Sequence, residues 1–264
     1  MKSAFSLVEL SIVLVILDLL TGGILGGQSL IRAAELRSVA TEHSRYVTAV
    51  QTFRDKYFAA PGDFRDATRF WLRMNGNADC VSTSGAGTNS AGACDGNGDG
   101  QVIWDNTLGA GASVEMHQFW RHLALAGLIE GTYTGLAGPN ASTDVRIGVN
   151  SPRSKLSNAG WGVGSNNCGS MLCFYGTSAP IYRNYLVFGA QHSDNTPLVG
   201  VLKPEEAWNI DTKMDDGRPA TGKLMPHWGA DNNCTTSDNL SDATGNYNLS
   251  DSTNWCALYF VQAF

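Results

Sequence analysis

Apolar residues dominate the chain over residues 5–31, and few polar residues interrupt them. As an α-helix this segment would be roughly 40 Å long, whereas about 30 Å is enough to cross the hydrocarbon core of a bilayer. A cleavable secretory signal has a shorter apolar stretch that ends in a small-residue cleavage site, and this segment lacks both features. The pattern therefore predicts a membrane-spanning helix over residues 5–31.

The pattern becomes amphipathic from residue 32, and no helix-breaking residue separates the two parts. Apolar and aromatic residues now recur at spacings of three and four, which is typical of one packed helix face. This stripe consists of Leu36, Val39, His43, Tyr46, Val50, Phe53 and Tyr57. The opposite faces carry the charged residues Arg32, Glu35, Arg37, Glu42, Arg45, Arg54 and Asp55. The same helix is predicted to continue over residues 32–60 and to end at Pro61-Gly62.

The remaining segment, residues 61–264, has short apolar runs between Gly-, Asn- and Ser-rich stretches, which is typical of a globular head. Helical spacing predicts helices over residues 67–74 and 114–128. Strands are predicted at four places, namely residues 143–149, 184–189, 197–202 and 257–262. His117 and His122 do not share a helix face, and we interpret them as ordinary surface or rim residues. The predicted fold class is α+β, with a long N-terminal helical stem packed on a globular domain that has a small antiparallel sheet.

Composition narrows the classes of function. The chain has a net charge of −6, and only 16% of its 264 residues are charged. An acidic chain without a Lys/Arg run gains little from phosphate attraction, so we expect no nucleic-acid partner. The sequence contains no HExxH, GxSxG, P-loop or dinucleotide-binding motif, so we expect a non-enzymatic protein.

The chain has six cysteines, which form three pairs of near neighbours in the sequence. No CxxC unit is present, which argues against a zinc ribbon or a thioredoxin-like site. Locality favours one of the 15 connectivities that six cysteines allow. Its disulfides are Cys80–Cys94, Cys168–Cys173 and Cys234–Cys256. Disulfide bonding of this kind indicates an oxidising compartment, either the periplasm or the cell surface.

Glu9 lies inside the apolar segment, where a carboxylate costs about 2.5–3.5 kcal/mol on insertion scales. It therefore calls for a partner, and the free α-amino group of a neighbouring subunit would serve. The run Ala4-Phe5-Ser6-Leu7-Val8-Glu9-Leu10 resembles the processing motif of type IV prepilins and type II secretion pseudopilins. Ala4 stands where this family usually has glycine.

The resemblance implies a set of roles and partners. Residues 1–4 would be a leader that a prepilin peptidase removes after Ala4, and the new amine of Phe5 would be methylated. Glu9 would then neutralise that amine in a neighbouring subunit during assembly. The implied partners are the peptidase, other pilin or pseudopilin subunits in a homo- or hetero-polymer, and an inner-membrane assembly platform.

The resemblance also implies a location and two functions. The chain would be a single-pass protein of the bacterial inner membrane before assembly, and then part of a periplasmic pseudopilus or a cell-surface pilus. One function is that of a pilin-like structural subunit of either filament. The alternative is a minor or tip subunit, in which the stem displays an adhesive head or binding module.

Two further features of the apolar segment leave alternatives open. Asp18 is either a tolerated polar residue on a packed face or a second polar contact between subunits. Gly22, Gly23, Gly26 and Gly27 form overlapping GxxxG spacings, which allow close helix packing in membranes. Glycine also weakens a helix by about 1 kcal/mol relative to alanine, so local melting in a filament is equally open.

The run Asp95-Gly96-Asn97-Gly98-Asp99-Gly100-Gln101-Val102 matches the front half of an EF-hand-type calcium loop. Asp95, Asn97, Asp99 and Gln101 would supply oxygens, and Asp105 or Glu115 would complete the shell because Asn106 stands where a bidentate Glu is expected. A calcium site in the head is also what the resemblance to secretion pseudopilins implies. The alternative is a flexible acidic turn. A weaker candidate is the cluster Asp211, Asp215 and Asp216.

Overall fold

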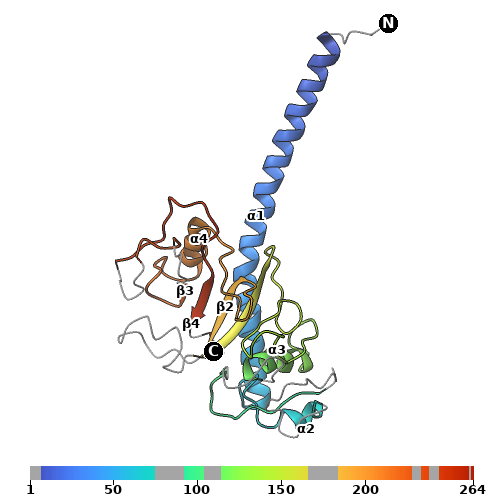
Figure 1. Ribbon diagram of the computed structural model, residues 1–264, viewed down its shortest axis with the longest axis vertical. Coiled ribbons are helices and arrows are strands. Elements are labelled where there is room, and N and C mark those ends of the chain that lie inside the picture. Colours follow the sequence, from blue (N-terminus) through green and yellow to red (C-terminus); the bar gives the residue numbers. More distant parts are fainter. Residues whose placement is uncertain are drawn as a thin grey trace.

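The computed structural model describes residues 7–74, 92–103, 114–165, 184–227, 233–237, 244–261 and 263–264. Within these residues a long helix projects from a globular head that contains a small sheet (Figure 1). The elements are α1 (Leu7–Tyr57), α2 (Ala67–Trp71), α3 (Glu115–Leu125), β1 (Ala159–Ser165), β2 (Asn184–Ala190), α4 (Pro204–Met214), β3 (Leu224–Pro226) and β4 (Leu258–Val261). The predicted α+β layout of a long N-terminal helix and an antiparallel sheet is therefore confirmed.

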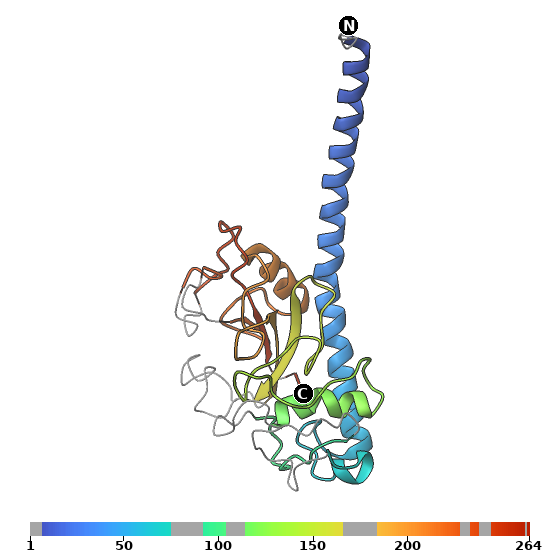
Figure 2. The same cartoon turned by 45° about the vertical axis from the view of Figure 1, so that its right-hand side comes forward.

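Helix α1 has 51 residues, which corresponds to roughly 77 Å. Figures 1 and 2 show that its N-terminal half extends beyond the head, while its C-terminal half lies along the head. We call residues 7–31 the upper half and residues 32–57 the lower half. The apolar stripe predicted for the lower half is confirmed, because Val39, Tyr46, Val50 and Phe53 are all buried.

The helix ends where Phe58 adopts a left-handed backbone conformation with a φ of 55°. Its amide N–H still donates to the carbonyl of Arg54 at 2.8 Å, as in a helix C-cap. Pro61 follows three residues later and cannot continue the helix. The predicted end of the stem is thus correct within three residues.

The four strands form an antiparallel sheet in the order β1-β2-β4-β3. One face of the sheet packs on the lower half of α1. His43 stacks on Phe260 with ring centroids 4.5 Å apart, and Tyr46 meets Trp161 edge-on at 5.5 Å. The main core therefore lies between the stem and the sheet, and His43 is a packed residue as predicted.

The opposite face of the sheet carries a second, smaller core of Tyr185, Val187, Leu198, Met225, Tyr259 and Val261. Strand β1 contributes glycines to this face. A Cβ on Gly162 would lie 2.7 Å from both Pro197 and Val187. Only a residue without a side chain lets these neighbours close over β1.

Helix α3 crosses the distal part of the head, and Phe119, Trp120 and Leu123 on it are buried. Trp120 meets Tyr46 of the stem edge-on at 5.1 Å. Both α3 and α2 fall inside the helices predicted from the sequence.

Two predicted strands are wrong. Residues 143–149 form turns with an isolated bridge between Ile147 and Ser151, and residues 197–202 make isolated bridges at Val199 and Leu202. Each apolar run is bridged at single positions instead of pairing along a continuous strand, and Val199 bridges to Ala190 at the end of β2. The strands β1 and β3 and the helix α4 are additional elements that the sequence pattern did not predict.

Cys234 and Cys256 form a disulfide with a Cα–Cα distance of 5.2 Å, the pairing that locality predicts. Cys94 is also disulfide-bonded. Its expected partner Cys80, together with Cys168 and Cys173, lies outside the described residues.

Candidate functional site

The upper half of α1 presents large apolar side chains to its surroundings. The most hydrophobic 18-residue window of α1 has a mean hydropathy of 2.2 and none of it is buried, so this helix could span a membrane. Fifteen large apolar side chains between Leu7 and Ile31 are at least half exposed. A helix in contact with water would not expose so large an apolar surface. The upper half is therefore a candidate surface for contact with lipid or with other helices.

Two carboxylates lie on this apolar surface. Glu9 and Asp18 are both exposed, and at about 100° per residue they point to opposite sides of the helix. A partner that approaches Glu9 therefore does not approach Asp18 from the same side. Ala4 and Phe5 lie outside the described residues.

The four glycines of the upper half do not interrupt α1. Gly22, Gly23, Gly26 and Gly27 each have open space where a Cβ would stand. Their surfaces are therefore free for a closely approaching helix in this conformation, and local melting is not needed to form the stem.

The lower half is attached to the head by buried polar bonds that the sequence pattern does not indicate. Glu42 lies on a face opposite the apolar stripe in the sequence pattern, yet only 6% of its surface is exposed. Its carboxylate accepts hydrogen bonds from the amide of Lys155 and the indole Nε1 of Trp161, both at 2.8 Å. Burial of the carboxylate is possible because these two donors replace the water that Glu42 loses.

Arg32 makes the corresponding attachment at the boundary between the two halves. Its guanidinium Nε and Nη2 donate to the two carboxylate oxygens of Glu206, each at 2.6 Å. Nη2 also donates to the carbonyl of Val201 at 3.2 Å. This bidentate pair fixes α4 against the stem one residue after the apolar segment ends.

The predicted calcium loop is held by two carboxylates from other segments. Asp63 accepts hydrogen bonds from the amides of Gly98, Asp99 and Gly100. Glu115, at the start of α3, accepts from the amides of Asn97 at 2.9 Å and Ile103 at 3.2 Å. The loop is therefore ordered around these two side chains.

Three of these carboxylates come close together. One oxygen from each of Asp63, Asp99 and Glu115 lies within 4.8 Å of the others. Burial raises the pKa of Glu115 from 4.5 to about 7 and raises that of Asp63, while amide hydrogen bonds oppose both shifts. Three crowded carboxylates could hold a hard divalent cation such as calcium, which prefers oxygen ligands.

The cluster differs from the one predicted. Asp99 and Glu115 belong to it, but Asp95 instead accepts hydrogen bonds from the amide and hydroxyl of Thr68, near the start of α2. Asn97 donates to Asp99 at 3.2 Å, and the side chain of Gln101 accepts a bond from Ser165 at 3.4 Å. Asp105 lies outside the described residues.

Asp63 is the member that sequence reasoning missed. Asp63 lies 36 residues before Asp99, so it is outside the run that has the spacing of a calcium loop. The sequence shows only that Asp63 directly follows the Pro61-Gly62 turn, and this position does not indicate which residues it contacts.

The second predicted cluster also forms, since Asp211, Asp215 and Asp216 have oxygens within 4.8 Å of one another. Burial raises the pKa of Asp211 from 3.8 to about 7, although the hydroxyl of Tyr247 donates to it at 2.8 Å. Asp215 accepts from the amide of Leu224 at 3.0 Å. These bonds organise the turn between α4 and β3.

The two histidines of α3 are buried, so their interpretation as surface residues is wrong. The Nδ1 of His122 accepts a bond from the amide of Gly62 at 2.9 Å, and its Nε2 lies 2.9 Å from the carbonyl of Cys94. The Nε2 of His117 lies 2.9 Å from the carbonyl of Ser142. Burial lowers the pKa of His122 to about 3 and that of His117 to about 4, so both are neutral links between loops.

A cleft of about 940 Å³ lies beside the C-terminal end of α1, and Asn184 and Phe264 also line it. Its lining includes Arg54 and Phe58 from the end of α1 and Arg65 from the following loop. Asp63 also lines it, so the cleft borders the three-carboxylate cluster.

Comparison of the chain with protein-family models, curated proteins and solved structures found no match.

Proposed function

We propose that this chain is a structural subunit of a type IV pilus or a type II secretion pseudopilus. The observation that supports this most is the division of α1 into an exposed apolar half and a half attached to the head. A membrane anchor needs only the apolar half. A filament subunit also needs a rigid connection between that half and the head, such as Arg32 and Glu42 supply.

Processing by a prepilin peptidase is part of this proposal. Cleavage after Ala4 would expose the amine of Phe5 four residues before Glu9. A protonated amine is a partner for Glu9 that also comes from an apolar surface, which offsets the cost of placing the carboxylate there. The chain would thus move from the inner membrane into a periplasmic or surface filament, through an assembly platform and beside other subunits.

The test replaces Glu9 with alanine in the organism's own filament system. Glu9→Ala should reduce the recovered filaments at least ten-fold while the chain still fractionates with the membrane. Asp18→Ala is the matched control, because it removes a carboxylate from the opposite side of the same apolar segment. Normal filament yield from Glu9→Ala would overturn the proposal.

Mass spectrometry of the mature chain gives an independent test of processing. The expected product begins with N-methylated Phe5. Retention of Met1 in assembled protein would contradict cleavage and favour a simple anchored protein.

A minor or tip subunit is the second candidate, and the distal cleft is the observation that favours it. The amount of the chain in purified filaments separates the two functions. A major subunit should be the dominant protein, whereas a tip subunit should be scarce relative to the filament mass.

Calcium binding at Asp63, Asp99 and Glu115 is a further part of the proposal. It rests on the calcium-loop spacing of the sequence and on the proximity of the three carboxylates. Calcium at about 100 times its Kd would add about 2.7 kcal/mol to the free energy of unfolding. For a chain of this size, that is a rise of about 5–10 °C in Tm over the same protein in EGTA.

Asp63→Asn should remove the calcium-dependent rise in Tm, while Asp216→Asn, in the second cluster, should keep it. Equal melting of the unaltered chain in calcium and in EGTA would contradict a calcium site.

A further inference from the structure

Asp18 places a carboxyl group near the middle of the apolar segment. The upper half covers residues 7–31 of α1, so its central residue is Leu19. If that centre lies at the bilayer midplane, Asp18 lies within about 2 Å of the midplane along the helix axis. An ionisable side chain is most costly at this depth, and where one occurs it usually has a partner in the membrane.

The chain itself supplies no such partner among the described residues. The side chain of Asp18 is exposed, and the hydroxyl of Thr21 donates to its backbone carbonyl, not to its carboxyl group. Asp18 and Arg32 have no charged residue between them, and Arg32 is already engaged with Glu206. A partner for Asp18 therefore has to come from another molecule.

The helix face around Asp18 is shaped for close approach of another helix. At about 100° per residue, Ser11, Gly22 and Ser29 lie within about 40° of Asp18. Gly22 has open space where a Cβ would stand. The hydroxyls of Ser11 and Ser29 donate to carbonyls three residues earlier in their own helix, both at 2.9 Å, so they need no acceptor from a partner. We call Ser11, Asp18, Gly22 and Ser29 the Asp18 face.

The residues of this face follow a spacing of seven. One row consists of Ser11, Asp18 and Leu25, and the row beside it of Val15, Gly22 and Ser29. Recurrence every seven residues keeps one face turned toward a parallel partner along the whole length of a left-handed helix pair. A single polar residue in such a row fixes the register, because it is satisfied only where it meets its counterpart.

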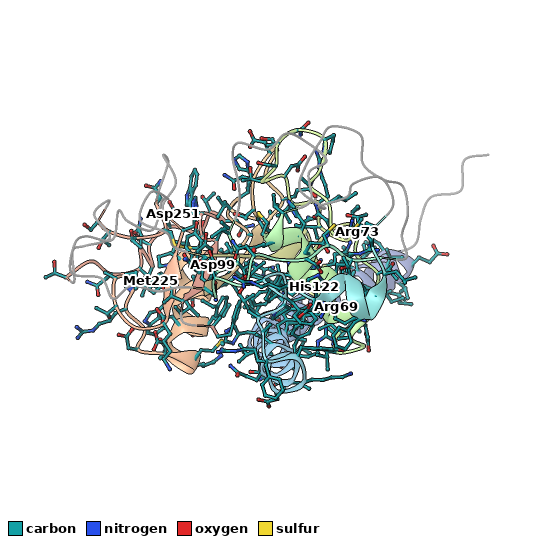
Figure 3. All side chains as sticks on the ribbon, turned by 90° about the horizontal axis from the view of Figure 1, so that it is seen from below. Arg69, Arg73, Asp99, His122, Met225 and Asp251 are labelled. Carbon is teal, nitrogen blue, oxygen red and sulfur yellow. A yellow bond between two sulfur atoms is a disulfide. The ribbon has the colours of Figure 1, made fainter. Side chains whose placement is uncertain are left out.

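The position of the head also permits a pair. Asp18 lies about a quarter of a turn around α1 from the face that packs on the head, of which the buried Tyr46 is the middle. Seen from below in Figure 3, the lower half of α1, in faint blue, lies at one side of the head. In a two-fold pair that meets at the Asp18 face, the two heads therefore lie on opposite sides and do not compete for space.

We propose that two copies of this chain pair side by side in the membrane through the Asp18 face, before they enter a filament. Both copies cross the bilayer in the same direction, so their Asp18 side chains meet at the same depth. A carboxyl group that has taken up a proton both donates and accepts, so two of them can bond to each other without placing charge in the hydrocarbon. A second copy is the partner that supplies a matching group at this depth by symmetry.

The inference rests on the membrane-spanning role of the upper half but not on filament assembly. Glu9 points to the side opposite Asp18, so it stays accessible in the pair for the assembly contact proposed above. Substitution of Asp18 should therefore abolish pairing and leave the filament yield unchanged. Glu9→Ala should do the reverse, so the two proposals fail separately.

The test measures Förster transfer between donor-labelled and acceptor-labelled copies of the full chain in phosphatidylcholine vesicles, at a low ratio of protein to lipid. Transfer should be present and should fall when unlabelled chain is added. Asp18→Leu should weaken pairing about three- to thirty-fold, the range for one hydrogen-bonded contact between membrane helices. Asp18→Asn should keep most of the pairing, because an amide also donates and accepts.

A second pair of variants tests the geometry of the contact. Gly22→Leu adds a bulky side chain to the Asp18 face and should weaken pairing by preventing close approach. Gly23→Leu is the matched control, because position 23 lies about 140° from Asp18, and it should pair as the unaltered chain does. Leucine forms helices better than glycine, so α1 is retained in both. Flotation with the vesicles and an unchanged Tm of the head show that each variant is inserted and folded.

Three results would overturn the inference. Absence of transfer, or equal transfer from the unaltered chain and Asp18→Leu, would mean that Asp18 stands in the membrane without a second copy. A loss in Gly23→Leu as large as in Gly22→Leu would place the contact on another side of the helix. Failure of the unaltered chain to float with vesicles would overturn the membrane span and this inference together.

Discussion

The upper and lower halves of α1 form one continuous helix but expose opposite surfaces. The upper half shows its Leu, Ile and Val side chains to its surroundings, whereas the lower half buries Val39, Tyr46, Val50 and Phe53. Glu9 and Glu42 follow the same division, because Glu9 is exposed and Glu42 is buried with two donors. Both halves have the same helical conformation. Their roles therefore differ because the head packs against the lower half and leaves the upper half exposed.

The largest expected effect removes a buried ring from the lower half. Phe53→Ala should lower the free energy of unfolding of the head by about 3–5 kcal/mol, because Phe53 is fully buried against Tyr57 and Phe64. Leu14→Ala, in the upper half, should leave it unchanged. Denaturant unfolding in detergent, followed by tryptophan fluorescence, measures both. Equal losses would mean that the upper half also belongs to the cooperative unit of the head.

The next effect concerns the buried carboxylate. Glu42→Ala would leave the amide of Lys155 and the indole of Trp161 without their acceptor, at about 1–3 kcal/mol each. Glu35→Ala, on a partly exposed side chain three residues from Arg32, should cost less than about 1 kcal/mol. Denaturant unfolding measures the stability of both variants. A Glu42→Ala variant as stable as Glu35→Ala would show that the hydrogen bonds of Glu42 do not stabilise the fold.

A third effect depends on pH. The pKa of Glu115 is raised from 4.5 to about 7. Between pH 4.5 and about 7, the folded chain therefore keeps a proton on Glu115 that the unfolded chain loses. The free energy of unfolding should therefore fall as pH rises from 4.5 to about 7 in EGTA, and this contribution should then level off. Asp211 contributes with the same sign, since its pKa is raised from 3.8 to about 7.

Melting curves across this pH range should become flatter in Glu115→Gln and flatter still when Asp211→Asn is added. A pH profile that keeps its full slope in both variants would assign the titration to other groups.

The smallest effect lies at the end of the lower half. Phe58→Gly should raise the free energy of unfolding by up to about 1 kcal/mol, because glycine tolerates the left-handed conformation of that position. Phe70→Gly, inside α2, should lower it by about as much. A loss of stability in Phe58→Gly would show that the ring supports the fold.

The stem could be predicted from the sequence because its signal is local. A long apolar run and a stripe at spacings of three and four specify the helix and its packed face without knowledge of the rest. Strand β1 has no such local signal, because its glycines have low β-propensity. The reason for glycine at these positions is the packing of Pro197 and Val187 over the strand, which the sequence does not show.

The candidate sites were less predictable because they join distant segments. Asp63 meets Asp99 across 36 residues, and Glu42 meets Trp161 across 119. The sequence pattern places Glu42 opposite the apolar stripe and gives no sign that it binds Trp161.

The pairing of Arg32 with Glu206 has a mechanical consequence. Together with Phe53 it marks out roughly 32 Å of helix over which the stem and head are joined. A pull along the helix axis loads these contacts in shear, so many must yield together before the head detaches. A sideways pull at the distal end would instead break the contacts between stem and head one after another. Those of Phe53 would break first and the pair of Arg32 and Glu206 last. The molecule should therefore resist tension along its stem far better than tension across it.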